Sequence, residues 1–192
     1  MKNKIVFFIF FTLFSFNLQA KTIAGVDLND EVVVAGQTLK LNGAGIRTKF
    51  VFDIYVAAFY TGNSVYKISD INLKDQPMRM AMHFVYDEVS KEKLVDGWND
   101  GFEDNLSDEQ FKKLKSRINL FNGLFSTVKA GDVIDLDYIP GKGTLVNINN
   151  ENKGVVSGSE FYKALLMIWL GEEPVGDDLK SALLGQTELD DD

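Results

Sequence analysis

The sequence has no cysteine, and its 192 residues include one histidine and three prolines. Without cysteine the chain can form neither a disulfide nor a zinc site of the cysteine–histidine type. A lipid-modified cysteine after an N-terminal leader is excluded for the same reason. The one histidine, His83, rules out a site with two histidine ligands, and no nucleophile-elbow motif accompanies it. We therefore expect no metal site and no cofactor, and we assign His83 no direct chemical role.

Basic residues are fewer than acidic ones. There are 20 lysines and arginines against 28 aspartates and glutamates, and the net charge is −8. Nucleic acids and anionic membrane surfaces are bound by basic patches, so this composition argues against both partners. Asp135 and Asp137 alternate with apolar residues in a predicted strand, and we interpret them as part of a solvated outer face. The acidic residues do not have EF-hand spacing, so a calcium site is not expected.

The N-terminus has the anatomy of a secretory signal peptide. Lys2 and Lys4 precede an apolar run over residues 5–16, and Ala20 supplies a small residue at the cleavage position. The apolar run is shorter than the roughly 20 residues that a membrane-spanning helix needs, although a retained anchor is the alternative. We predict a signal peptide over residues 1–20, a single domain over residues 21–192, a periplasmic location, and no stable membrane insertion after leader removal.

Hydrophobic periodicity divides the mature chain into blocks of strands and helices. A period of two predicts strands at 22–28, 31–34, 37–41, 50–60, 65–69 and 78–86, with the Gly43-Ala44-Gly45 run as a turn. Serine caps and apolar residues three and four apart predict helices from Ser90 and from Ser107, the second with a capping box and an apolar series that continues to Val128. Strands follow Gly131, and two helices then cover about 158–170 and 177–184. Ser157 and Glu160 predict a capping box at the start of the first of these. Strands in a run and segregated helices indicate an α+β fold with an antiparallel sheet.

One arginine lies just before the most apolar strand. Residues 50–60 are apolar on both faces apart from Asp53 and the Tyr55 hydroxyl, so the strand is expected to be buried on both sides. We expect Arg47 to be substantially buried, where it and Tyr55 together would make a receptor for one carboxylate or enolate. In an unbroken strand they would be about 26 Å apart, so they can share a ligand only if the chain turns between them, for instance at Thr48-Lys49. An Arg47–Asp53 ion pair is the competing, structural interpretation.

Four segments resemble the chalcone isomerase family: LNGAGIR, FDIYVAAFY, FVYDEVS and IWLGEEPVGDDLKSALLG. The resemblance extends over about 36–185 and is best to bacterial exported members and to the fatty-acid-binding branch found in plastids. It implies an open-faced β-sandwich, with a large antiparallel sheet covered on one face by a helical layer and a ligand cleft between them. In that family an arginine matching Arg47 binds a phenolate in the enzymes. In the fatty-acid-binding branch it clamps a carboxylate, with a tyrosine that matches Tyr55.

The sequence departs from the enzymes at their other polar positions. The enzymes have a threonine where Tyr55 stands and a second threonine that meets Ile168. The helix over 90–105 has no tyrosine, and its lysines and asparagines do not fall at the matching places. The resemblance therefore favours a non-catalytic protein that binds a small hydrophobic anion, such as a fatty acid, through Arg47 and Tyr55. The alternatives are an isomerase of the chalcone type acting on a phenolic or enone substrate, and an envelope protein that binds a partner without a ligand.

Overall fold

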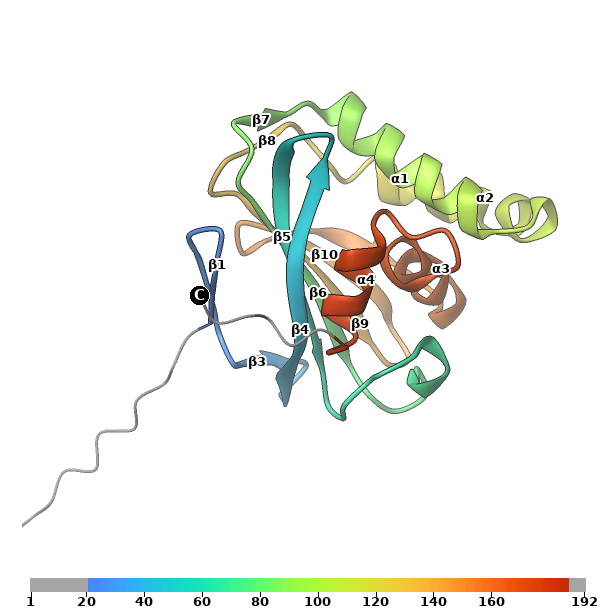
Figure 1. The fold of residues 1–192 in the computed structure, drawn as a ribbon. Helices are drawn as coiled ribbons and strands as arrows, with labels where there is room; N and C mark the ends of the chain where they lie inside the picture. The colour runs from blue at the N-terminus through green and yellow to red at the C-terminus, as the bar shows by residue number, and fades with distance from the viewer. Residues whose placement is uncertain (1–20, 187–192) are drawn as a thin grey trace, which may run out of the picture.

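The computed structural model describes residues 21–186 and shows an antiparallel seven-stranded sheet beside four α-helices (Figure 1). The order of strands across the sheet is β11-β10-β9-β6-β5-β4-β3. The strands of this sheet are β3 (Glu31–Val34), β4 (Gln37–Lys49), β5 (Phe52–Thr61), β6 (Met78–Phe84), β9 (Val133–Ile139), β10 (Gly143–Ile148) and β11 (Glu151–Val156). The predicted signal peptide, residues 1–20, lies outside the described residues.

Two small two-stranded ribbons and the helices complete the fold. The ribbons pair β1 (Lys21–Ile23) with β2 (Val26–Leu28), and β7 (Glu88–Val89) with β8 (Val128–Lys129). The helices are α1 (Lys91–Asn105), α2 (Asp108–Asn122), α3 (Ser159–Leu170), α4 (Asp177–Leu183) and a 3₁₀ turn, η1 (Ile68–Asp70). Ser90 caps α1 and accepts from the Lys93 amide, and the predicted capping box between Ser107 and Gln110 opens α2.

The helices lie on one face of the sheet and enclose the larger of two apolar clusters (Figure 1). Successive side chains of β5 point to opposite faces of the sheet, so this strand contributes residues to both clusters. Tyr55, Ala57 and Phe59 face the helices, whereas Val56 and Ala58 face a smaller cluster that includes Leu28 of β2. Both sets are buried, as the apolar character of both faces of this strand predicts. The arrangement confirms the predicted α+β fold, a large antiparallel sheet covered on one face by a helical layer.

The structure differs from the sequence predictions at several points, and the predicted strand over 22–28 is divided into the paired strands β1 and β2. Residues 65–69 form no strand, because the Asn42 side chain binds both backbone groups of Val65, at 2.7 Å and 2.8 Å. The helix α2 ends at Asn122, and the apolar residues after it join the core from an irregular segment. The predicted capping box at Glu160 does not form, because this carboxylate pairs instead with Arg117 of α2 at 2.7 Å.

Candidate functional site

The hairpin of β4 and β5 places Arg47 directly opposite Tyr55. Directly opposite residues of an antiparallel pair project from the same face, with Cβ atoms about 4.5–5.5 Å apart. The separation expected along an unbroken strand therefore does not apply. The chain turns at Phe50-Val51, two residues later than the predicted Thr48-Lys49. The two predicted site residues are thus neighbours, brought together by main-chain pairing.

The Gly43-Ala44-Gly45 run is not the turn that the sequence predicts, because it lies within β4. A Cβ added at Gly43 would lie 2.1 Å from the Ala182 carbonyl oxygen, and one added at Gly45 would lie 2.9 Å from the Ala182 Cβ. These glycines are therefore needed for the close approach of α4 to the strand. The contact holds the C-terminal helix against the strand that carries Arg47.

A cavity of about 580 Å³ lies between the sheet and the helical layer, and Arg47 and Tyr55 both line it. This volume falls in the usual range for small-molecule sites, about 300–1,000 Å³. Apolar side chains from β5, β6, α1 and α3 make up much of the wall, among them Ile54, Met82, Phe84, Leu94, Trp98 and Ile168. The opening carries charges of both signs, from Lys49 and Lys93 as well as Glu88, Asp96 and Asp100. The cavity can enclose an apolar body beside an arginine and a phenol.

Tyr55 is deeply buried, and its hydroxyl accepts a hydrogen bond of 3.0 Å from Nε1 of Trp169. Burial raises the pKa of Tyr55 to about 12, although the Trp169 bond and the positive charge of Arg47 both act to lower it. The phenol therefore keeps its proton at neutral pH. Because Trp169 occupies an acceptor position of the oxygen, the O–H remains a donor for a group in the cavity.

Arg47 is half-buried, so it is less enclosed than the sequence prediction of a substantially buried guanidinium. Its Nη1 donates to the adjacent Thr48 carbonyl. Arg47 is not among the ion pairs found within residues 21–186. The competing pair with Asp53 does not form, because Asp53 is exposed and accepts from the Thr48 hydroxyl at 2.9 Å. Most of the five N–H groups of Arg47 are thus available to an anion in the cavity.

Sequence reasoning did not assign a role to the two tryptophans of this site. Trp169 is fully buried on α3 and positions Tyr55. Trp98 lines the cavity from α1 and contacts Trp169 edge to face, with ring centroids 5.8 Å apart. The Nε1 of Trp98 is buried and has no hydrogen-bond partner within the described part of the chain. Trp169 could have been identified as a candidate site residue, because it lies in the C-terminal segment that resembles the family.

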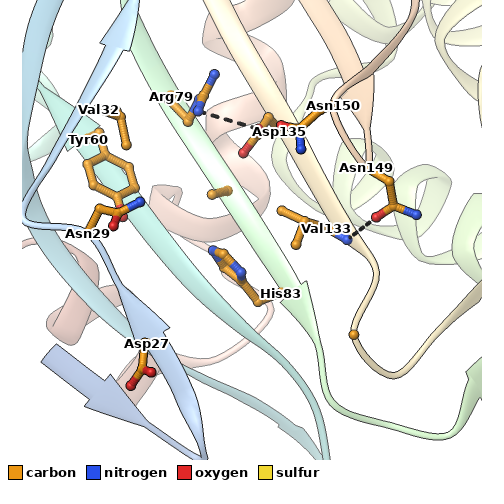
Figure 2. Close-up of a pocket in the computed structure, with 12 residues that line it drawn as sticks. Asp27, Asn29, Val32, Tyr60, Arg79, His83, Val133, Asp135, Asn149 and Asn150 are labelled. Atoms are coloured by element: carbon orange, nitrogen blue, oxygen red, sulfur yellow. Dashed lines mark hydrogen bonds and ion pairs between the residues drawn. The ribbon is translucent and has the colours of Figure 1, made fainter. Parts of the chain in front are cut away.

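A smaller cavity of about 360 Å³ lies on the opposite face of the sheet (Figure 2). Figure 2 shows Tyr60 of β5 together with Arg79 and His83 of β6 at this cavity. Burial, followed by the charge of Arg79, lowers the pKa of His83, so the imidazole is neutral at pH 7. The walls are mainly polar, and they offer little apolar surface to a hydrophobic ligand.

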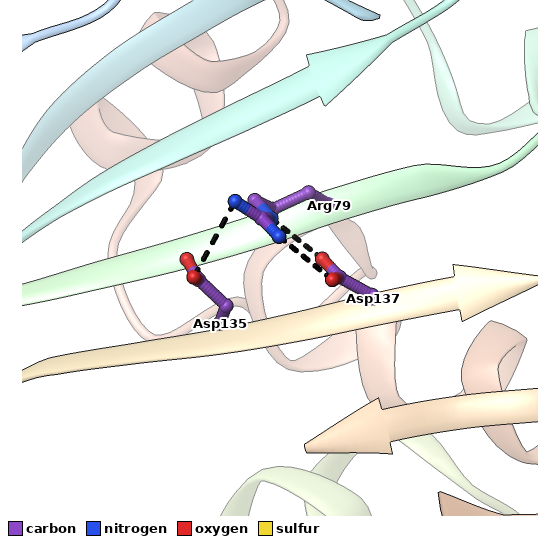
Figure 3. Close-up of polar contacts among 3 residues, drawn as sticks. All are labelled: Arg79, Asp135 and Asp137. Atoms are coloured by element: carbon purple, nitrogen blue, oxygen red, sulfur yellow. Dashed lines mark hydrogen bonds and ion pairs between the residues drawn. The ribbon is translucent and has the colours of Figure 1, made fainter. Parts of the chain in front are cut away.

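The acidic residues beside this cavity correct the prediction of a solvated face. Asp137 is 3% exposed and pairs with Arg79 through two bonds of 2.6 Å and 2.7 Å (Figure 3). Asp135 lies 3.4 Å from the third nitrogen of the same guanidinium. Burial raises the pKa of Asp135 to about 6, and Arg79 opposes the increase. Since Arg79 already has two carboxylate partners, this cluster is a structural ion network, and the cavity at Arg47 is the better candidate site.

Within residues 21–186 no group of three or more histidine, cysteine or carboxylate side chains is arranged to hold a metal ion. None of the helices formed by these residues is long and apolar enough to cross a membrane.

Comparison with known proteins agrees with this architecture. The profile of the chalcone isomerase-like family matches residues 20–185. The fold is similar to the crystal structure of a fatty-acid binding protein from Arabidopsis thaliana, with a TM-score of 0.64 and 18% sequence identity. The match covers 83% of this chain and 92% of the plant protein. A search of curated proteins finds no match. At this level of identity the structural likeness establishes the fold alone.

Proposed function

Since the chain belongs to the chalcone isomerase-like family, we propose that it is a non-catalytic binding protein for a hydrophobic anion such as a fatty acid. The observation that carries the proposal is the cross-strand pairing of Arg47 with Tyr55 at the wall of a largely apolar cavity. A carboxylate can accept two parallel bonds from a guanidinium and a third from the phenol. The fatty-acid binding protein from Arabidopsis thaliana, which shares the fold, supports a ligand of this class.

The walls of the cavity suit the tail of such a ligand. Met82 and Phe84 project from β6, while Leu94 and Ile168 face them from α1 and α3. Transfer of an alkyl chain from water to such a surface is worth about 0.8 kcal/mol per buried methylene. Affinity should therefore rise with chain length until the cavity is full. The Trp98 N–H, buried without a partner in the described residues, is a further donor beside the ligand.

The polar groups at the cavity favour binding over catalysis. Ring closure of a chalcone needs donors placed around a ketone, whereas the wall beside Tyr55 has the apolar Ile168 where the enzymes carry a threonine. With a pKa of about 12, Tyr55 is a weak general acid or base at neutral pH. It is suited to a permanent hydrogen bond with a carboxylate. We further propose that the protein works in the periplasm, on the basis of the predicted signal peptide.

Displacement of a fluorescent fatty acid by hexadecanoate tests the proposal. The wild type should bind the probe and release it to hexadecanoate. Arg47→Ala should bind about 10- to 100-fold more weakly, because a hydrogen bond to a charged group contributes about 1.5–3 kcal/mol. Arg117→Ala is the matched control, since Arg117 lies on α2 and takes no part in lining the cavity.

Circular dichroism should show that both variants remain folded. The proposal is wrong if the wild type does not bind the probe. It is equally wrong if folded Arg47→Ala binds hexadecanoate as tightly as Arg117→Ala does.

A further inference from the structure

The turn between β4 and β5 exposes three consecutive apolar side chains. Phe50 is 91% exposed, Val51 82% and Phe52 52%. Phe50 also has a φ of +58°, a left-handed conformation that bulky residues rarely adopt. A polar residue or glycine would suit this turn better on both counts. None of the three belongs to the two apolar clusters of the domain, so core packing does not explain an apolar turn at this position.

The exposed turn lies at the opening of the candidate ligand cavity. Lys49, Phe50 and Phe52 belong to its wall, together with Glu88 and Lys93 near the start of α1. Figure 1 shows the end of the β4–β5 hairpin on the same side of the molecule as β7 and the start of α1. A surface that receives the turn would therefore face the cavity opening.

We propose that this turn inserts into the surface of a lipid bilayer, so that the cavity exchanges its acyl ligand directly with the membrane. The exchange rests on the proposed function, whereas the insertion can be tested without it. Phe50 and Val51 would enter the boundary between head groups and acyl chains. Lys49 is exposed and directly precedes Phe50, so its charged end can extend to the lipid phosphates.

The shape of the apolar surface favours a bilayer over a protein partner. A stable protein–protein interface buries about 800 Å² on each side and is built from 20 or more residues. Here the exposed apolar surface is a narrow turn of three residues, suited to insertion into a fluid layer. The net charge of −8 opposes attraction to anionic lipid, so apolar burial must drive the contact. Binding should therefore occur on zwitterionic lipid and should change little with salt.

Flotation with phosphatidylcholine vesicles tests the insertion. The wild type should float with the vesicles in both low and high salt. Val51→Asp should reduce the bound fraction at a given lipid concentration by at least about tenfold, because it replaces an inserted apolar group with a charge. Val51 is exposed and does not line the cavity, so binding of decanoate in vesicle-free solution should be unchanged.

Val33→Asp is the matched control. Val33 is 66% exposed on β3, and it pairs with Thr38, at the other end of β4 from the turn. This variant should bind vesicles like the wild type. The proposal is overturned if the wild type does not float, or if the two variants lose binding equally.

A second copy of the chain could cover the turn instead of a bilayer, and analytical ultracentrifugation tests for such a dimer. A wild-type dimer that Val51→Asp converts to a monomer would assign the turn to self-association and overturn the membrane contact. Failure of the proposed function has a different signature. The protein would then float with vesicles through Val51 but would bind no decanoate in solution.

Discussion

The hydrogen bond from Trp169 to Tyr55 gives the most detailed prediction of this structure. Tyr55→Phe removes the hydroxyl and leaves the buried Trp169 N–H without its acceptor. An unsatisfied buried donor costs about 1–3 kcal/mol, so the free energy of unfolding should fall by that amount. If the Tyr55 hydroxyl also donates to a bound carboxylate, affinity for hexadecanoate should fall about 10- to 100-fold.

Tyr60→Phe is the matched control for this experiment. Tyr60 lies on the same strand and is also buried, but it faces the opposite side of the sheet. No hydrogen bond of its hydroxyl is found within residues 21–186, so its removal leaves no buried partner unsatisfied. Tyr60→Phe should therefore cost less stability than Tyr55→Phe and leave hexadecanoate binding intact.

Urea denaturation monitored by tryptophan fluorescence measures both stabilities, provided that the variants share one m-value. The role of the Trp169 bond is refuted if Tyr55→Phe is as stable as Tyr60→Phe. The role of Tyr55 in the site is refuted if both variants bind hexadecanoate equally.

Three other predictions concern packing, charge and catalysis. Gly43→Ala should destabilise the protein by about 1–3 kcal/mol in urea denaturation, because a Cβ there would overlap the backbone of α4. Gly97→Ala, with open space around it, should stabilise it by about 0.5–1 kcal/mol. Because burial raises the pKa of Asp135 to about 6, its contribution to stability is fully present below about pH 4 and is lost as the pH rises through 6. As the pH rises from 4 to 7, the free energy of unfolding of Asp135→Asn should therefore increase by about 1–3 kcal/mol relative to that of the wild type. A difference between the two proteins that does not change with pH would contradict this. A chalcone absorbance assay should show no efficient turnover, and efficient turnover that Arg47→Ala abolishes would restore the enzyme hypothesis.

The sequence predicted the parts of the fold that depend on local pattern. Alternation along β5 is visible in consecutive residues, so burial of both faces could be predicted, and it holds from Tyr55 onward but not for the exposed residues 50–53. The caps at Ser90 and Ser107 are equally local. The family resemblance supplied the architecture and directed attention to Arg47 and Tyr55.

Features that depend on distant partners could not be predicted in the same way. Glycine serves both in turns and where another element approaches closely, and the helix that approaches Gly43 begins more than a hundred residues later. The true turn at Phe50 has no glycine, so it gave no turn signal. The pattern placed Asp137 correctly on one face of its strand, but its partner Arg79 comes from a separate strand, β6.

The central claim is that Arg47 recognises an anionic head group, and the most direct test compares two ligands with the same tail. Calorimetric titration with hexadecanoate and hexadecanol, in the wild type and in Arg47→Gln, isolates the contribution of the charge. The wild type should prefer the carboxylate by about 10- to 100-fold, and Arg47→Gln should bind the two ligands with nearly equal affinity. A preference of the same size in both proteins would contradict the assignment of Arg47 as the head-group clamp.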